Sequence, residues 1–328
     1  MSRENRLIYL DYLKVLGLLL VILAHVSCPN VIMQIRSFDV PLLVFVSAYL
    51  ASKTYIPGQN VQYFVKRIKR LAVPAWIFLI VFFIIQTVAY SKPSIIDIIK
   101  AITFQRDSNM LGMLWVIWVY LICALLIPVI QKMDLSRKSE AIIIVGFIMF
   151  ELICTFTNLS NNRFVYITIM TIIPWGALSY FGFYYDQISA KKKMQIVIFS
   201  SLIFIILAII LANRYGHFIM TNDYKYPARL YYVSFSVPII VFLMEYSKKM
   251  YLPEIRILSF VSSSSLWIYL WHILFLYVVK SIIQNDNYWL LQYVLIVILS
   301  VIITYIQNFI VKKMMLKYEW NFLKVFLG

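Results

Sequence analysis

Long runs of uncharged, apolar residues set the main limit on how this chain can fold. Five segments contain no Asp, Glu, Lys or Arg, and these are residues 71–91, 111–130, 164–185, 257–279 and 288–311. A helix needs about 20 mostly apolar residues to cross the hydrocarbon core of a bilayer, and each of these runs has roughly that length. Because the bilayer core offers no water to unpaired backbone groups, such runs cross it as helices. The sequence therefore predicts an all-α membrane protein.

Further apolar runs bring the predicted number of membrane spans to about ten. We place the spans, within several residues, at 8–27, 37–53, 71–91, 111–131, 141–158, 164–185, 194–212, 228–246, 257–280 and 288–311. The short segment 37–53 is the least certain in extent because it begins beside Arg36 and Asp39. No polar stretch is long enough for a separate soluble domain. We therefore expect a polytopic transmembrane helical bundle with one membrane-embedded domain, residues 1–328.

The distribution of Lys and Arg predicts the orientation of the bundle. With the N-terminus in the cytoplasm, 20 of these residues fall on the cytoplasmic side and 9 outside, and Lys14 lies within the first span. This bias follows the positive-inside rule and predicts that both termini are cytoplasmic. The nine residues assigned to external loops are Arg36, Lys92, Lys100, Arg106, Arg163, Arg214, Lys225, Arg229 and Lys280.

The net charge of +16 has its source in this topology, although in a soluble chain it would suggest nucleic-acid binding. Charged residues make up only 13% of the sequence, against roughly 25% in soluble proteins. We expect no nucleic-acid partner. The three cysteines, Cys28, Cys123 and Cys154, form neither a CxxC pair nor a metal-binding spacing, so we expect no disulfide framework.

The first predicted span holds three ionisable residues, Asp11, Lys14 and His25, which are costly inside a membrane. Asp11 and Lys14 are three residues apart and can neutralise each other on a helix. Lys14 and His25 are eleven residues apart, which on a regular helix is three turns plus roughly 20° and about 16 Å of rise. One helix face would then carry a cation near the cytoplasm and an imidazole near the outside. A snorkelling Lys14 with an interfacial His25 is the alternative.

His272 lies in another apolar predicted span and needs a partner or a cavity there. Histidine titrates near neutral pH and is a natural general base for a hydroxyl group. Two histidines without a cluster of Cys, Asp or Glu make a poor metal site, so we expect no metal. No GxSxG motif supports a serine nucleophile.

Three further features have less specific readings. Glu151 falls in the middle of a predicted span, whereas Glu245 is expected at the cytoplasmic interface. The external loop 213–227 is either a lid or a solvated connection, and we favour the solvated connection.

Several motifs resemble those of the membrane acyltransferase 3 family, whose members O-acylate extracytoplasmic sugars and related acceptors. In that family the first span carries Asp, a cation three residues later, and His after ten more residues, as Asp11, Lys14 and His25 do. The second-span pattern F-x-V-P-L-F-F-F-x-S-G-Y is matched in part by FDVPLLVFVSAYL, with Leu43, Val44 and Ala48 as departures. The remaining matches are Leu114, Trp115, Tyr120 and Pro128 in a middle span and Ser265, Leu266, Ile268, Tyr269, Leu270 and His272 late in the chain. The ordered set, which covers residues 9–272, is more specific than any one motif.

This resemblance implies an O-acetyltransferase of the cell membrane that takes acetyl from cytoplasmic acetyl-CoA and places it on a hydroxyl of a surface or lipid-linked glycan. Acetyl-CoA is then a donor substrate, and no bound cofactor is expected. We assign the general base to His25, a charge-stabilising or CoA-binding role to Lys14, and the orientation of Lys14 to Asp11. The residues expected to line the cavity are Ser47, Trp115, Tyr269 and His272. Lys66, Arg67, Lys69 and Arg70 lie on the donor's side, where topology alone explains them more simply.

Two other classes of function remain open on the sequence alone. A glycan or lipid transporter would also have many spans with polar groups near the midplane, but its expected inverted repeats are not visible. A non-catalytic partner of a polysaccharide synthase is the second alternative. Contacts with membrane lipids are expected in each case. The acceptor, the acyl length and a homo-oligomeric state stay open.

Overall fold

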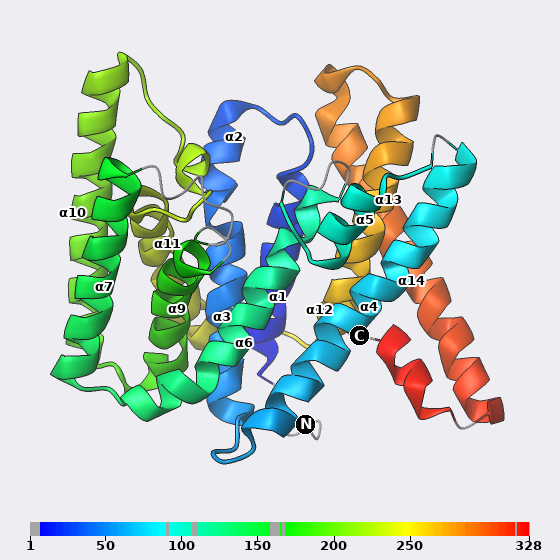
Figure 1. Cartoon of the computed structure of the whole chain (residues 1–328), viewed down its shortest axis with the longest axis horizontal. Coiled ribbons are helices and arrows are strands. Elements are labelled where there is room, and N and C mark those ends of the chain that lie inside the picture. The colour runs from blue at the N-terminus through cyan, green and yellow to red at the C-terminus, as the bar shows by residue number, and fades with distance from the viewer. Residues whose placement is uncertain are drawn as a thin grey trace. The chain divides into compact units, whose positions relative to one another are not determined.

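The computed structural model describes residues 7–89, 92–106, 111–157, 165, 168–318 and 320–327. Every regular element in these residues is a helix, which confirms the predicted all-α fold (Figure 1). The α-helices are α1 (Ile8–Leu23), α2 (Asn30–Ile35), α3 (Asp39–Thr54), α4 (Asn60–Ala89), α5 (Ile95–Ile102), α6 (Trp115–Met133), α7 (Arg137–Phe156), α9 (Ile169–Tyr184), α10 (Ala190–Tyr215), α11 (Leu230–Lys249), α12 (Arg256–Ser263), α13 (Ser265–Ile282) and α14 (Trp289–Tyr318). Short 3₁₀ turns are η2 (Arg36–Phe38), η3 (Gly112–Leu114), η5 (Tyr185–Gln187), η6 (Thr221–Tyr224), η7 (Asp286–Tyr288) and η8 (Asn321–Phe326).

Eight helical segments of the described chain are long and apolar enough to cross a membrane. They are Asn30–Thr54, Asn60–Ala89, Gly112–Met133, Arg137–Phe156, Ala190–Tyr215, Leu230–Lys249, Ser265–Ile282 and Asp286–Tyr318. The other two predicted spans correspond to α1 and α9, which have 16 described residues each. At 1.5 Å per residue, 16 residues rise about 24 Å, somewhat less than a hydrocarbon core. The chain is therefore a multi-pass membrane protein, while ten spans and cytoplasmic termini stay predictions.

The structure falls into two compact units, each assembled from separate stretches of sequence. The first unit comprises Met1–Leu13, Pro29–Asn60 and Ile122–Pro253, and the second comprises Lys14–Cys28, Val61–Leu121 and Glu254–Gly328. The prediction of one domain over residues 1–328 stays a prediction.

In the first unit α3 packs against α9, and α10 packs against α11. The α3–α9 contact is close at Gly182, where an added Cβ would lie 2.6 Å from the backbone oxygen of Phe45. Only glycine permits this approach, because a methyl group there would overlap the carbonyl. No side chain of α10 is buried, and its exposed apolar residues, such as Phe199 and Ile206, suit contact with lipid.

In the second unit α13 packs along α14, and the C-terminal turn η8 packs against α14. The indole of Trp267 on α13 donates to the carbonyl of Val325 over 3.0 Å and stacks on Phe326. The amide of Gln307 on α14 donates to the carbonyl of Phe326 over 2.8 Å. These bonds attach the chain's last described residues to the helix pair.

The helices at the third and ninth predicted spans depart from the prediction in instructive ways. α4 begins at Asn60, so Lys66, Arg67, Lys69 and Arg70 lie within a helix instead of a loop. Nothing in that stretch breaks a helix, and the Tyr63 hydroxyl accepts from Arg67 one turn later. The span predicted at 257–280 is interrupted at Ser264, which separates α12 from α13. The serine run there competes with helical hydrogen bonding, and Asn308 donates to the Ser264 hydroxyl over 3.0 Å.

The prediction of a solvated connection at 213–227 is wrong for its second half. Thr221 and Lys225 are buried there. The backbone N–H of Thr221 donates to the side-chain oxygen of Gln34 over 2.9 Å, which joins this segment to α2 within the first unit. A loop whose polar groups find partners in the protein does not need water around it.

Candidate active site

The regular helix α1 ends at Leu23, two residues before His25. The amide of Ala24 is shared between the carbonyls of Leu20 and Val21, and the amide of His25 reaches back only three residues, to Ile22. This tightening precedes Pro29, which disfavours a helical conformation in the residue before it. The regular helical spacing on which Lys14 and His25 would share a face ends at Leu23, so the shared face stays a prediction.

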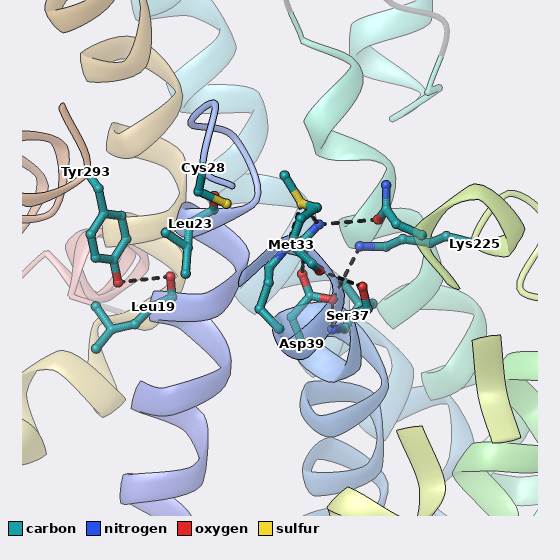
Figure 2. A network of polar contacts seen from close by, with 11 residues as sticks. Leu19, Leu23, Cys28, Met33, Ser37, Asp39, Lys225 and Tyr293 are labelled. Carbon is teal, nitrogen blue, oxygen red and sulfur yellow. Dashed lines mark hydrogen bonds and ion pairs between the residues drawn. The ribbon is translucent and has the colours of Figure 1, made fainter. Parts of the chain in front are cut away.

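Two side chains contact carbonyl groups in the last part of α1 (Figure 2). The hydroxyl of Tyr293, on α14, donates to the carbonyl of Leu19 over 3.2 Å. The thiol of Cys28 contacts the carbonyl of Leu23 over 3.9 Å, which is a weak sulfur hydrogen bond. These contacts fix the end of the helix and the turn that carries His25.

The ring of His25 lies beside the ring of His272 from α13. The ring centroids are 5.4 Å apart and the planes are inclined by 30°. His25 is half-buried and His272 is completely buried. We call these two residues the histidine pair. The sequence placed both in the site but gave no reason to set one ring against the other, since 247 positions separate them.

The two ring nitrogens of His272 have different surroundings. Nδ1 is hydrogen-bonded to the backbone carbonyl of Tyr269. A carbonyl can only accept, so Nδ1 carries the hydrogen and a neutral ring has its lone pair on Nε2. Nε2 is buried and has no hydrogen-bond partner within the described residues.

Tyr269 links this pair to the start of α6 in the second unit. Its ring centroid lies 4.9 Å from that of His272, and its hydroxyl donates to the carbonyl of Met113. Met113 lies in η3, directly before α6, which begins at Trp115. The preceding residue, Gly112, lies so close to the Arg106 carbonyl that a Cβ there would overlap its oxygen. The position of the α6 start is therefore tightly determined.

The structure thus brings together His25, Tyr269 and His272 of the predicted site residues. Trp115 and Lys14 belong to the same unit, and both are half-buried. Asp11, which is 5% exposed on α1, and the half-buried Ser47 on α3 belong to the first unit.

A buried charged cluster in the first unit was missed by the sequence analysis. Arg36 and Lys225 were assigned to external loops, but both are buried around Asp39, which has no exposed surface. Arg36 Nη1 bonds to Asp39 Oδ2, and Lys225 Nζ lies 3.3 Å from Asp39 Oδ1 (Figure 2). We call Arg36, Asp39 and Lys225 the Asp39 cluster. The i,i+3 spacing of Arg36 and Asp39 was a visible signal, whereas nothing local indicated Lys225.

The burial of Lys225 beside Asp39 and Arg36 shifts the pKa of its amine. Burial lowers the pKa of the Lys225 amine, the Asp39 carboxylate opposes that effect, and Arg36 adds to it. The Arg36 guanidinium also donates to the Asn222 side chain and contacts the sulfur of Met33. These partners make the cluster a connection between the start of α3 and the segment before α11.

Glu151 and Glu245 also have cationic partners in the first unit. Glu151, on α7, accepts from Arg229 over 2.8 and 3.0 Å and from the first backbone amide of α11. Arg229, assigned to an external loop, is therefore part of a helix connection. Glu245 accepts from Lys193 over 2.8 Å and from the Tyr185 hydroxyl over 2.7 Å. Both carboxylates fix helix ends.

Asp186 is held in the first unit in the same way as Asp39, but at a partly exposed position. Lys53 and Lys248 each approach it to 2.6 Å, and the Tyr49 hydroxyl donates to it over 2.7 Å. We call Lys53, Asp186 and Lys248 the Asp186 cluster. Burial raises the pKa of this carboxyl, but the hydrogen bonds from Lys248, Lys53 and Tyr49 outweigh that effect and hold it below its usual value.

The family model described as an acyltransferase domain matches residues 7–307, which include all the predicted site residues. No curated protein and no solved structure matched the chain. The matched range covers most of the chain and contains the histidine pair. The chain therefore belongs to the acyltransferase 3 family and is a membrane acyltransferase.

Proposed function

We propose that this protein is an O-acetyltransferase of the cell membrane that moves acetyl from acetyl-CoA onto a hydroxyl of a surface or lipid-linked glycan. The observation that carries the proposal is the half-buried imidazole of His25, held against a buried second imidazole in a chain of this family. Acyl transfer to an alcohol requires a group that accepts the hydroxyl proton, and a neutral imidazole is suited to that task.

In this proposal His25 takes the proton as the acceptor oxygen attacks the thioester carbonyl. The new C–O bond forms, the C–S bond breaks, and the departing thiolate receives the proton from the His25 imidazolium. No oxidation or reduction occurs. Lys14, a cation on α1, stabilises the negative charge that develops on the carbonyl oxygen or holds a CoA phosphate.

The remaining site residues have supporting roles in the proposal. Asp11 orients Lys14, from which it is separated by three residues on α1. Tyr269 and Trp115 shape the site from α13 and the start of α6. Ser47, on α3 of the first unit, stays a candidate because of its family motif. Membrane lipids surround the apolar helices, and neither nucleic acid nor a metal is required.

The decisive test is transfer of radiolabelled acetyl from acetyl-CoA to glycan in membranes that contain the full chain. The matched control is His25→Gln, which keeps a polar side chain of similar length but cannot act as the base. Labelled, alkali-labile acetyl on the glycan with the parent, and its loss in the control, are the expected results. Unlabelled glycan in both membranes, with the protein present in equal amounts, would reject the proposal.

Mass spectrometry of surface glycans from cells with and without the chain addresses the acceptor. An added acetyl mass that depends on the chain and on His25 is expected. Loss of whole glycan from the surface without any change in acetylation would instead favour a transporter or a partner of a polysaccharide synthase.

A further inference from the structure

His272 has one satisfied and one unsatisfied ring nitrogen, although the whole residue is buried. Native proteins rarely leave a buried polar atom without a hydrogen-bond partner, and an atom that is left so often has a functional role. The Nε2 lone pair of His272 can only accept a hydrogen bond when Nδ1 carries the hydrogen. A donor is therefore missing from this position in the described structure.

His25 is the neighbouring group that can supply such a donor. Its ring centroid is 5.4 Å from that of His272, close enough for a modest rotation to bring a ring nitrogen towards Nε2. A neutral imidazole has one N–H group, and an imidazolium has two. The neutral His25 ring can direct its one N–H at His272 Nε2 and accept a proton at its other nitrogen, and the positive charge that this proton brings strengthens the hydrogen bond to Nε2.

We propose that His272 is a positioning residue that accepts a hydrogen bond from protonated His25 and thereby stabilises the imidazolium during acyl transfer; this inference rests on the proposed function. The proton comes from the acceptor hydroxyl as its oxygen attacks the thioester carbon. It stays on the His25 nitrogen that received it until the C–S bond breaks and the thiolate takes it, while the N–H on the other ring nitrogen donates to His272 Nε2. No other reactant is needed.

The anchoring of His272 suits it to this role. The carbonyl of Tyr269 fixes the tautomer, so the lone pair stays on Nε2. The Tyr269 hydroxyl is in turn bonded to the carbonyl of Met113, which limits movement of this part of α13 within the second unit. Fixed orientation of an acceptor makes a charge-assisted hydrogen bond more effective, because less reorganisation is needed when the charge appears.

Two substitutions separate the acceptor role from simple packing. His272→Asn places an amide near the position of Nδ1 and leaves nothing at Nε2. His272→Gln reaches the position of Nε2 and offers an acceptor oxygen there. Asn and Gln are both neutral and polar, so general effects of burying an amide are similar for the two.

The first measurement is steady-state acetyl transfer by the purified full chain, with kcat and the KM of donor and acceptor determined separately. His272→Asn is expected to lower kcat roughly 10- to 100-fold, the range of one hydrogen bond to a charged group. Both KM values should stay within about twofold of the parent, since the bond becomes strong only when His25 is charged during the reaction. His272→Gln should recover most of the lost kcat. Equal kcat in the two variants, or a loss confined to KM, would overturn the proposal.

A second measurement does not depend on acyl transfer. Diethyl pyrocarbonate modifies neutral imidazole, so its rate of reaction with His25 at pH 6, relative to pH 8, reports the protonated fraction by mass spectrometry. This ratio should rise in His272→Asn and stay near the parent value in His272→Gln, with the exposed His217 as internal control. Equal ratios in all three proteins would reject the contact. The expected order of ratios in a protein that transfers no acetyl would reject the proposed function alone.

Discussion

The Asp39 cluster and the histidine pair are both buried polar groups, but the protein satisfies them to different degrees. Asp39 has two cations and a backbone amide around its carboxylate. The Nε2 atom of His272 has no hydrogen-bond partner within the described residues. A charge that is fully paired resists change, because removing one partner leaves another charge buried. An unpaired neutral atom can still take part in a reaction. We therefore expect the Asp39 cluster to stabilise the fold and the histidine pair to take part in the proposed chemistry.

The largest expected effect is on catalysis at the histidine pair. His25→Gln should lower acetyl transfer by about 10²- to 10⁴-fold, the usual contribution of a positioned acid–base group. The yield and the thermal midpoint of the purified protein should stay near those of the parent, because the His25 ring is half-buried and the substitution keeps a polar side chain. Initial rates with labelled acetyl-CoA and a thermal unfolding scan in detergent check the two parts.

An unfolding midpoint that falls together with activity would contradict this contrast, because it would make His25 a structural residue. Near-normal transfer in both His25→Gln and His272→Gln would remove histidine catalysis altogether.

The Asp39 cluster should show the opposite pattern. Asp39→Asn leaves Arg36 and Lys225 buried without the carboxylate, a change that typically costs about 3–5 kcal/mol of stability. The expected result is a large fall in the unfolding midpoint of the purified protein. Denaturation followed by fluorescence-detected gel filtration measures it.

A second substitution tests the cause. Adding Lys225→Met to Asp39→Asn removes one of the two uncompensated cations, so the double variant should be more stable than Asp39→Asn alone. A double variant that is less stable by the sum of the two single effects would show that the charges do not interact.

A substitution at Gly182, in the same unit, should lower stability less than Asp39→Asn does. Gly182→Ala places a methyl group 2.6 Å from the Phe45 oxygen, and overpacking of this kind typically costs about 1–3 kcal/mol. Gly146→Ala is the matched control, since its Cβ meets nothing within 4 Å and alanine favours a helix. Thermal midpoints should fall for Gly182→Ala and stay level or rise for Gly146→Ala. The reverse order would contradict the close approach of α3 and α9.

The sequence predicted the helices better than it predicted their ends and contacts. Apolar runs locate membrane helices because lipid solvates whole segments, and α4, α6 and α14 follow the predicted spans closely in their apolar parts. The end of α1 at Leu23 was missed, because hydropathy continues through His25 while the backbone turns before Pro29. The contact of His25 with His272 depends on how distant segments fold together, which no local pattern encodes.

The contacts of charged residues near helix ends were likewise not predictable from the sequence. The positive-inside rule counts charges without regard to burial, so Arg36 and Lys225 were placed in external loops. Both cations are buried because they pair with the carboxylate of Asp39, which lies 186 positions from Lys225 in the sequence. The sequence did supply the candidate residues His25 and His272, since ionisable groups in apolar runs are rare enough to mark a site. Tyr269 was supplied by the resemblance of its motif to the acyltransferase 3 family.

The smallest expected effect is at the Asp186 cluster, which has the same make-up as the Asp39 cluster, one carboxylate and two cations, but a different exposure. The Asp186 side chain is 37% exposed, whereas that of Asp39 is fully buried. Water screens exposed ion pairs, and each such pair contributes about 0–1 kcal/mol. Asp186→Asn should therefore change the thermal midpoint at pH 7 far less than Asp39→Asn does.

The pH dependence of the thermal midpoint gives a further check at Asp186. The pKa of Asp186 is held below its usual value, so the ionised carboxylate stabilises the folded protein above about pH 4. This stabilisation is lost as the pH falls through the pKa in the folded protein. The midpoint of the parent should thus fall slightly more than that of Asp186→Asn when the pH is lowered from 5 to 3. If Asp186→Asn proved as destabilising as Asp39→Asn at pH 7, burial would not be what distinguishes the two clusters, and the contrast with the histidine pair would have to rest on charge alone.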